Sequence, residues 1–346
     1  MAATAKSAPA ECFDGTSRRR FRQRLLRWFD REQRKLPWRG ETDPYRILLS
    51  EIMLQQTRVA VVEDRYRLFL GQFPNIEQLA QASEESVLAA WSGLGYYRRA
   101  RSLHAAAKVV AQNNSFPRSS IELAELPGVG RYTAAAVASI AFGEPAAVVD
   151  GNVQRVIGRV TGKQLPVKEC WETAQALLHP RRPGDFNQAM MELGAVVCLP
   201  ANPACDRCPV IDFCQLRGAE QPRAAQQPRK KATLAYLFAQ RKNHVLLRQR
   251  MQSASLMPGM WELPEMKVPK GMPRKPLLQL RHSITNTDYR VLIFAENGHK
   301  PLNQNLEKRD SRWVSLSFVR DLALTGLTSK ILRALDLLPM NPRTSL

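Results

Sequence analysis

Acidic residues are scarce in this chain, since 31 Asp and Glu stand against 51 Lys and Arg, which leaves a formal net charge of +20. An excess of this size favours a polyanionic partner, because basic side chains that neutralise phosphates release bound counterions. Nucleic acid is the first candidate. A solvated basic surface without a partner fits the composition nearly as well, so the charge indicates a class of partner and no chemistry.

Long hydrophobic runs are also missing. No apolar stretch in the 346 residues approaches the ~18 residues of a membrane-spanning helix. The first seventeen residues contain Ala, Ser and Thr without the hydrophobic segment of a secretory signal. We therefore predict a disordered tail over residues 1–17 and a reducing location, either cytoplasmic or nucleoid-associated.

Cysteine is scarce too, with six residues in the whole chain, but four of them lie within one short segment. Cys198, Cys205, Cys208 and Cys214 have the spacing C-x6-C-x2-C-x5-C. So few cysteines in a reducing compartment argue against a disulfide framework. Four thiolates within seventeen residues can instead converge on an iron–sulfur cluster or a structural zinc ion.

The periodicity is helical from about residue 18 to residue 217. Its first segment carries an apolar stripe at helical spacing, formed by Phe21, Leu25, Trp28 and Phe29. Residues 18–39 also carry ten basic and two acidic side chains, a face that is either solvated or lies along a duplex. Further on, Ser83 predicts a helix start, and residues 132–142 predict a helix of small side chains.

Residues 218–231 have the composition of a linker, with two prolines, a basic run and no apolar period. Beyond them the pattern changes to strands followed by a final helix. The expected strands cover residues 233–239, 245–247 and 289–295, and the helix covers residues 328–338. We predict a second, α+β domain over residues 232–340.

A short segment between two helical stretches, Leu126-Pro127-Gly128-Val129-Gly130, predicts a tight turn. Gly128 and Gly130 permit close backbone approach to a partner, and the amides of the following helix start can face a phosphate. A generic glycine turn between helices is the alternative that the motif alone leaves open.

Two acidic residues stand out by their surroundings. Glu51 lies in an otherwise apolar helical segment, where burial would keep a carboxylic acid protonated near neutrality. Asp150 lies just before a helix start, where backbone amides favour the charged carboxylate. Carboxyl groups in such different environments suit the cleavage of a glycosidic bond, one as acid and one as stabiliser of a sugar cation. A lone glutamate in a helix is more often an ordinary surface residue.

The order of the motifs along the chain is similar to that of a known protein family, and this resemblance decides between the alternatives. In chain order they are LPWR at 36–39, DPY at 43–45, SEIMLQQT at 50–57, GLGYY at 93–97, LPGVGRYT at 126–133, VVDGNV at 148–153 and the four cysteines. The chain resembles the MutY family of adenine DNA glycosylases, closely over residues 20–217 and more loosely beyond. The resemblance implies an all-α helix–hairpin–helix glycosylase domain over residues 18–217 with an iron–sulfur loop, followed by an α+β, Nudix-like domain.

The resemblance also implies a function and partners. The protein would remove adenine mispaired with 8-oxoguanine or guanine in double-stranded DNA, carry one [4Fe-4S] cluster on the four cysteines, and act as a monomer. Glu51 would protonate the flipped adenine and Asp150 would stabilise the sugar cation, assisted by Asn152 and Tyr132. Glu192 would contact the adenine.

Other positions match contacts to the DNA and the lesion. Gln56 and Tyr96 match residues that wedge into the base stack, where they help offset the cost of base flipping. Contacts around the lesion are matched by Arg34, Leu36, Arg39 and Thr57. An ordinary core role for Tyr96 and a surface or phosphate role for Arg39 are the simpler alternatives.

Tyr132 separates two activities within the superfamily. Endonuclease III-like enzymes have a lysine at this position, which forms an imine with the sugar and cuts the strand. A tyrosine cannot form an imine, so we predict a monofunctional glycosylase. A bifunctional lyase acting on oxidised pyrimidines and a DNA-binding protein without enzymatic activity are the competing hypotheses.

The C-terminal region departs from the family pattern. The opening spacing of a Nudix box is present at Gly259 and Glu265, but its glutamate-rich part is replaced by Lys and Pro. We therefore expect recognition of 8-oxoguanine and no pyrophosphatase activity, since Mg²⁺ would lack ligands. Thr285 and Asn286 align with the family's serine and histidine, and Ile284 replaces an aromatic residue.

Overall fold

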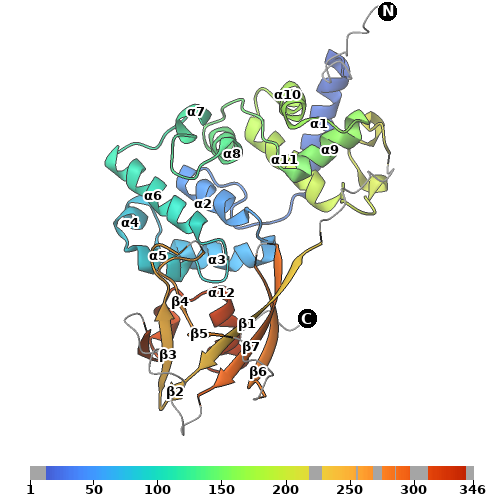
Figure 1. Cartoon of the computed structure of the whole chain (residues 1–346). Helices are drawn as coiled ribbons and strands as arrows, with labels where there is room; N and C mark the ends of the chain where they lie inside the picture. The colour runs from blue at the N-terminus through green and yellow to red at the C-terminus, as the bar shows by residue number, and fades with distance from the viewer. Residues whose placement is uncertain are drawn as a thin grey trace, which may run out of the picture. The chain divides into compact units, whose positions relative to one another are not determined.

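The computed structural model describes residues 13–217, 228–254, 256–267, 275–284, 286–296 and 311–339. Its contacts divide the chain into two compact units (Figure 1). The first unit contains Met1–Gln81 and Ser102–Arg223, and the second contains Ala82–Arg101 and Ala224–Leu346. None of the helices described has the length and apolar character to cross a membrane.

The first unit is helical in the part described. Its elements are α1 (Gly15–Glu32), α2 (Pro44–Leu54), α3 (Val59–Gln72), α4 (Ile76–Gln81), α7 (Ser120–Leu123), α8 (Arg131–Ala141), α9 (Gly151–Thr161), α10 (Val167–Leu177), α11 (Pro183–Val196) and the short 3₁₀ turns η2 (Cys205–Arg207) and η3 (Ile211–Phe213). A further helix, α6 (Arg98–Gln112), has residues in both units.

The core of the first unit follows from the apolar stripe of α1. Phe21, Leu25, Trp28 and Phe29 are all buried there, as the 3.6-residue period predicts. They pack with side chains of α9 and α11, including Val156, and helix α11 also contacts α8. Helix α2 contacts α8 in turn, so this packing positions α2, α8, α9 and α11, which carry the site.

The N-terminal end of α1 is well defined. Asp14 caps it by accepting a hydrogen bond from the backbone amide of Ser17 at 2.6 Å, and Phe13 is buried. Residues 1–12 of the predicted tail lie outside the described residues. The remaining residues of that tail form the cap and first turn of α1.

The second unit combines strands with short helices. Its elements are α5 (Glu84–Ala90), β1 (Lys230–Phe238), β2 (Gln240–Arg241), β3 (His244–Gln249), β4 (Trp261–Glu262), β5 (Glu265–Met266), β6 (Leu278–Ile284), β7 (Thr287–Ala295), β8 (Ser311–Ser315), the 3₁₀ turn η4 (Val319–Asp321) and α12 (Gly326–Ala334). The strands form one sheet of order β5-β1-β7-β6 and another in which β3 pairs with β2, β4 and β8.

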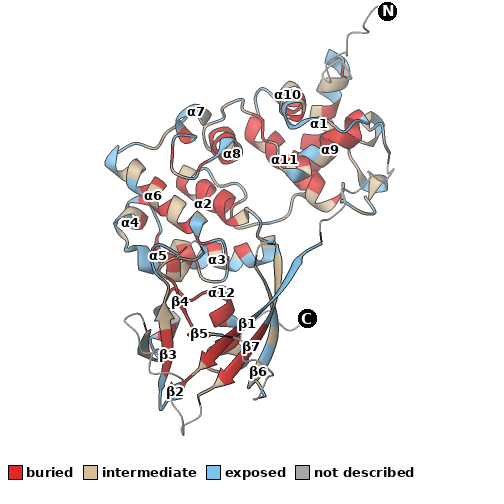
Figure 2. Ribbon diagram, in the orientation of Figure 1, coloured by how far each residue is buried: buried red, intermediate tan, exposed pale blue. Residues whose placement is uncertain are grey.

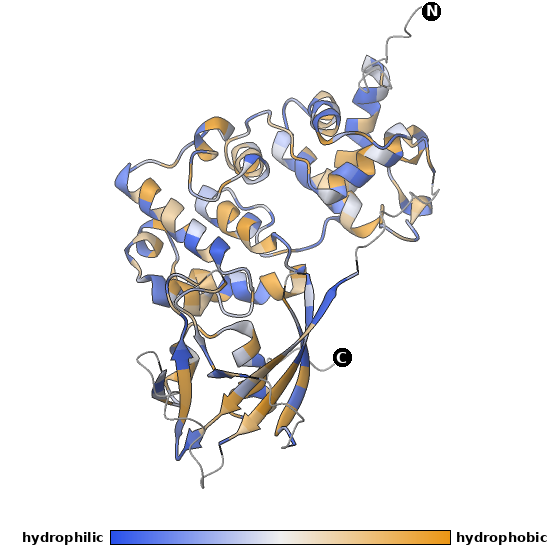
Figure 3. Cartoon of the chain, in the orientation of Figure 1, coloured by the Kyte–Doolittle hydropathy of each residue, from blue (hydrophilic) through white to orange (hydrophobic). Residues whose placement is uncertain are grey.

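Strands β1 and β7 form the parallel centre of the first sheet, and β6 pairs antiparallel with β7. The apolar stretches of β1 and β7 (Figure 3) are also their buried stretches (Figure 2). Side chains of α12, among them Ile331 and Leu332, complete this core. The sequence therefore forms an α+β unit, in agreement with its strand pattern.

Several predicted boundaries differ from the observed ones. β1 begins at Lys230, inside the segment expected to be a linker, of which residues 218–227 lie outside the description. The last helix ends at Ala334, four residues before its predicted end at residue 338. The backbone at Asp336 is left-handed, with φ of 56°, a conformation that an α-helix cannot continue through.

Residues 82–101, which we expected within the glycosylase domain, cluster with the strands instead. Ser83 caps α5 as predicted by accepting a hydrogen bond from Ser86. The hydroxyl of Tyr97 donates to the carbonyl of Leu324 at 3.1 Å. Contacts of this kind join segments more than 200 residues apart, and a local pattern does not reveal them.

Candidate active site

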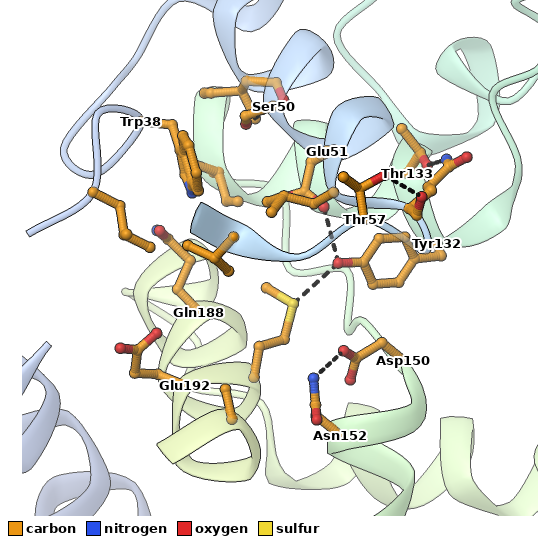
Figure 4. A pocket seen from close by; sticks show the side chains of 18 of the residues that line it. Trp38, Ser50, Glu51, Thr57, Tyr132, Thr133, Asp150, Asn152, Gln188 and Glu192 are labelled. Atoms are coloured by element: carbon orange, nitrogen blue, oxygen red, sulfur yellow. Dashed lines mark hydrogen bonds between the residues drawn. The ribbon is translucent and has the colours of Figure 1, made fainter. Parts of the chain in front are cut away.

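A cavity of about 730 Å³ in the first unit brings most of the predicted site residues together. It is lined by α2, α8, α11, the start of α9 and the segment that follows α1 (Figure 4). The predicted residues in its lining are Arg34, Leu36, Arg39, Glu51, Gln56, Thr57, Gly128, Gly130, Tyr132, Asp150, Asn152 and Glu192.

Helix α2 positions Glu51. Asp43 caps the helix by accepting a hydrogen bond from the amide of Tyr45 at 2.8 Å, and Pro44 occupies the first turn. Every residue from Ile47 to Met53 is buried, and Glu51 itself is 7% exposed. The helix therefore presents a carboxyl group to the cavity from apolar surroundings.

The carboxyl of Glu51 is hydrogen-bonded by Tyr132, the second residue of α8 (Figure 4). The tyrosine hydroxyl lies 2.9 Å from Glu51 Oε2 and 3.1 Å from Met191 Sδ. The pKa of Glu51 is raised to about 7, mainly by burial and in addition by the charge of Asp150, while the hydrogen bond from Tyr132 and the charge of Arg39 oppose the increase. Glu51 can therefore exchange a proton near neutral pH.

Asp150 is held as the N-cap of α9. Its Oδ1 accepts from the amide of Val153 at 2.7 Å, and its Oδ2 accepts from the side-chain amide of Asn152 at 2.9 Å. Helix α11 lies directly against Asn152, because a Cβ added to Gly194 would come within 2.6 Å of the Asn152 Cβ. Two donors and a tightly packed neighbour thus fix this carboxylate at the cavity.

Asn152 in turn is connected to the cysteine loop through Arg155. The Arg155 guanidinium donates to Asn152 Oδ1 at 2.8 Å, to the carbonyl of Gly194 at 2.7 Å and to the carbonyl of Cys198 at 2.8 Å. One side chain therefore links the Asp150 environment with the start of the cysteine segment.

Glu192 on α11 is 1% exposed and forms ion pairs with two arginines. Arg34 binds it in a fork, with Nε 2.7 Å from Oε1 and Nη2 3.0 Å from Oε2, and Arg39 Nη2 lies 2.6 Å from Oε2. Burial pushes the pKa of Glu192 up, but the hydrogen bonds from Arg34 and the charge of Arg39 outweigh it and leave that pKa below its usual value. Glu192 is therefore an ionised anchor in the cavity wall.

The predicted tight turn precedes α8. Gly128 has φ of 74°, and a Cβ at this position would come within 2.3 Å of the Ser102 Cβ. Gly130 is the N-cap of α8 and would meet no atom within 4 Å. Only the first of the two glycines is therefore required by both backbone conformation and space.

All four predicted cysteine ligands lie on one loop that packs against α9. The amides of Gln215 and Leu216 donate to the carbonyls of Val160 and Arg159. The pKa of Cys208 is raised to about 11, mainly by burial and in addition by the other three predicted ligands. Within the residues described, no group of three or more His, Cys, Asp or Glu side chains is arranged as a metal site.

Arg159 is a buried cation that contacts this loop, and it is only 2% exposed. Its Nη1 lies 3.3 Å from Cys198 Sγ and 2.6 Å from the carbonyl of Leu199, and Nη2 donates to the carbonyl of Pro200 at 3.1 Å. Its Nε has no hydrogen-bond partner among the described atoms. No carboxylate in the described part of the chain pairs with this arginine, although a buried cation requires an anion.

Two of the predicted DNA-contacting residues do not line this cavity. Tyr96 and Asn286 belong to the second unit, and both are exposed. Asn286 follows β6 at the two-residue connection to β7, where Ile284 pairs with Thr287. Thr285 lies outside the described residues.

Comparison with known proteins identifies the family of the helical part of the chain. Residues 49–177 match the family described as HhH-GPD superfamily base excision DNA repair protein. The adenine DNA glycosylase of Homo sapiens is 47% identical over 214 residues, which cover 57% of this chain and 39% of the human protein. That of Buchnera aphidicola subsp. Baizongia pistaciae is 36% identical over 66% of this chain and 69% of its own length.

The chain belongs to the HhH-GPD superfamily of base excision DNA repair proteins. It spans about two fifths of the human and mouse relatives that it matches, at 39% and 41% of their lengths. A structure of a thermostable thymine-DNA glycosylase aligns with a TM-score of 0.55 and 33% identity, over 58% of this chain and 97% of that chain. A trapped endonuclease III–DNA intermediate has the same fold, with a TM-score of 0.52 and 24% identity over 59% and 97% of the two chains.

Other lining residues of this HhH-GPD site were not predicted. They include Trp38, Gln55, Thr133, Gln188 and Met191. Gln188 precedes Glu192 by one helical turn and accepts a hydrogen bond from Arg39, so the i, i+4 spacing on α11 was the available signal. Trp38 lies inside the quoted LPWR motif, between two residues already singled out.

Proposed function

We propose that this protein is a DNA glycosylase of base excision repair that removes adenine mispaired with 8-oxoguanine or guanine. The observation that carries the proposal is the Glu51 carboxyl, buried at a cavity with a pKa of about 7. A group with this pKa is a suitable general acid near neutrality. Support for adenine as the base comes from the names of the relatives, which are 35–48% identical over the matched segments.

Glu51 would donate its proton to a ring nitrogen of an adenine flipped into the cavity. The electron pair of the N-glycosidic bond then leaves with the protonated base, and the sugar becomes an oxocarbenium-like cation. Water then adds to the sugar carbon and gives up one proton to the Glu51 carboxylate, which yields an abasic site and free adenine and restores the acid. The hydrogen bond from Tyr132 orients the Glu51 carboxyl during this transfer.

Asp150 would stabilise the sugar cation. Its carboxylate is fixed by Val153 and Asn152, so little reorganisation is needed when the positive charge develops. Tyr132 stands where a lyase of this superfamily would have its lysine. A phenol cannot form an imine, and for this reason we favour a monofunctional glycosylase over the bifunctional lyase.

The remaining lining residues would recognise the DNA. We assign Glu192, held by Arg34 and Arg39, to the wall around the base, and Leu36 and Thr57 to the surroundings of the lesion. Gln56 and Tyr96 would enter the base stack. Both have left-handed backbones, with φ of 56° and 48°, and non-glycine residues in this conformation are often found at functional tips.

The second unit would serve as a Nudix-like reader of 8-oxoguanine. Asn286 is exposed at the connection between β6 and β7, and its side-chain amide can both donate and accept. Thr285 would add a hydroxyl next to it. We infer that the partner is double-stranded DNA, bound by a monomer in a reducing compartment, in the cytoplasm or the nucleoid.

The four cysteines would hold one [4Fe-4S] cluster. Two observations support the fit, namely the Cys205 and Cys208 thiols, whose pKa is raised by burial and by the neighbouring predicted ligands, and a buried Arg159 that lacks a carboxylate partner among the described residues. A cluster with four thiolates supplies the missing negative charge. It would order the loop against α9, and no step of the reaction is assigned to it.

The cluster is tested with Cys205→Ser. We expect the variant to lose iron and sulfide, to unfold at a lower temperature and to bind DNA more weakly, with a smaller effect on the chemical step. Elemental analysis of the wild type distinguishes iron from zinc. Stoichiometric zinc without iron, or a variant with normal stability and binding, would contradict the cluster.

The function is tested by single-turnover reactions on three duplexes. They carry adenine opposite 8-oxoguanine, adenine opposite guanine, and thymine glycol, and each is analysed with and without alkali. We expect strand breakage at adenine only after alkali, fastest opposite 8-oxoguanine. Alkali-independent cutting at thymine glycol would instead establish the lyase.

A further inference from the structure

Helix α1 carries a row of arginines that the proposed chemistry does not use. Arg20, Arg24, Arg27 and Arg31 follow one another at spacings of four, three and four residues, which places them on one helical face. We call these four residues the arginine ridge. The opposite face of α1 is the buried apolar stripe, so the ridge is held on a firmly packed helix.

The ridge is almost free of counter-charges. Arg20, Arg27 and Arg31 are exposed, and none of the three forms an ion pair with another described residue. Arg24 pairs with Asp212 of the cysteine loop. Two acids are exposed on this part of α1: Asp30 is bound by Arg182 at 2.6 Å, and Glu32 forms no ion pair with a described residue.

The pair between Arg24 and Asp212 joins the ridge to the cysteine loop. Phe213 supports the junction, with its ring 5.7 Å from that of Phe21 and under the Arg24 guanidinium. Arg217, three residues beyond Cys214 at the end of the loop, is also exposed. The positive surface therefore continues from α1 onto the end of the loop.

Such an arrangement is unfavourable for the helix alone. Like charges three and four residues apart destabilise a helix, and the ridge contains three such successive pairs. A polyanion would relieve this repulsion. The ridge is about 16 Å long at 1.5 Å per residue, and therefore matches a row of roughly five phosphates at about 3.4 Å each along one strand of a duplex.

The C-terminal end of α1 is the end of the ridge that leads to the cavity. Arg31 precedes Arg34, which lines the cavity, by only three residues. From there the ridge extends away along α1 toward Arg20. We propose that the arginine ridge binds backbone phosphates of duplex DNA flanking the nucleotide that occupies the cavity. This proposal deepens the proposed function and rests on it for the choice of DNA as the polyanion.

The test uses the triple variant Arg20→Gln, Arg27→Gln and Arg31→Gln, which keeps the pair between Arg24 and Asp212. Binding of an undamaged duplex is measured over a range of salt concentrations. Each phosphate contact contributes about 0.9 to the slope of log K against log salt, so we expect the slope to fall by roughly two to three. The melting temperature without DNA should stay equal or increase, because repulsion is removed.

A matched variant removes the same charge elsewhere on the first unit, at the exposed Lys108, Lys163 and Lys168, each changed to Gln. We expect it to lower the slope by less than one unit. An equal loss in both variants, or an unchanged slope in the ridge variant, would overturn the proposal. So would a ridge variant that loses DNA binding only because its melting temperature has fallen.

Two further experiments identify the partner of the ridge and distinguish a failure of this proposal from a failure of the proposed function. Shortening the duplex on one flank should remove the difference in DNA affinity between wild type and ridge variant, and an affinity difference that is independent of duplex length would count against the ridge.

Vesicles of anionic lipid should bind both proteins equally, and a loss of vesicle binding by the ridge variant alone would mean that the ridge binds a membrane surface instead. Binding of undamaged DNA needs no excision, so a wild type inactive on adenine would refute the function while the salt slope still tests the ridge.

Discussion

Glu51 illustrates how the surroundings of a residue determine its chemistry. Its type and position in a helix are unremarkable, and its pKa is raised to about 7 first by burial among apolar side chains and then by the nearby Asp150. Glu192 experiences comparable burial in the same cavity, yet Arg34 and Arg39 lower its pKa. One lining carboxyl can therefore carry a proton at pH 7 while another remains ionised.

Replacing Glu51 with Gln should separate chemistry from stability. We expect base release to be abolished in single-turnover assays, while binding to the mispair stays within a few fold.

The same substitution should change stability. Since the pKa of the Glu51 carboxyl is raised from 4.5 to about 7 in the folded state, the folded state loses stability as the pH rises across this window, by roughly 3 kcal/mol once the pH exceeds 7. Denaturant unfolding at pH 8 should therefore show a more stable variant, and one that is less stable than wild type would refute the buried-acid assignment.

The pH dependence follows from the same group. Glu51 must be protonated to act as an acid, so the single-turnover rate should fall as the pH rises through about 7. The rate is measured at saturating enzyme, with binding checked at each pH. A rate that rises steadily from pH 6 to pH 9 would exclude Glu51 as the acid.

Single elements show which parts of the structure could be predicted from sequence. The stripe of α1 and the cap at Ser83 have local signals, and both are found as expected. The clamp on Glu192 has no such signal, because Arg34 lies 158 residues away. The end of α12 was also missed, since nothing in the apolar pattern reveals the left-handed backbone at Asp336.

The turn before α8 allows an element-scale prediction with an internal control. Gly128→Ala combines a strained φ of 74° with a Cβ placed 2.3 Å from the Ser102 Cβ, so we expect a loss of about 2 kcal/mol or more in unfolding free energy. DNA binding should weaken with it. Gly130→Ala meets no atom within 4 Å and should cost less than about 1 kcal/mol. Equal effects from the two substitutions in chemical denaturation would contradict this account of the turn.

At the scale of the whole molecule, the two units are not consecutive in the chain. Residues 82–101 cluster with a sheet that begins more than 120 residues later, at Lys230. The sequence placed the helical and strand-rich regions correctly but could not assign this segment, since helical periodicity does not identify the packing partner. The domain boundaries we predicted from composition remain a prediction.

Removing residues 224–346 tests this division. The remaining chain would keep Trp91 and Tyr97, which are fully or almost fully buried, and Tyr97 would lose its hydrogen bond to Leu324. We expect the truncated protein to bind a hydrophobic dye and to lose protection from proteolysis within residues 82–101. Hydrogen exchange in that segment equal to that of the full chain would show that it belongs with the first unit.

The interleaved path has an evolutionary consequence. A recognition module that is encoded only at the end of a gene can be gained or exchanged by recombination at one junction. Here the strands belong to one compact unit with residues 82–101, which are encoded between segments of the unit that holds the cavity. A transplanted C-terminal half would therefore meet a foreign surface at Tyr97, and functional chimaeras between relatives should require exchange of both segments together.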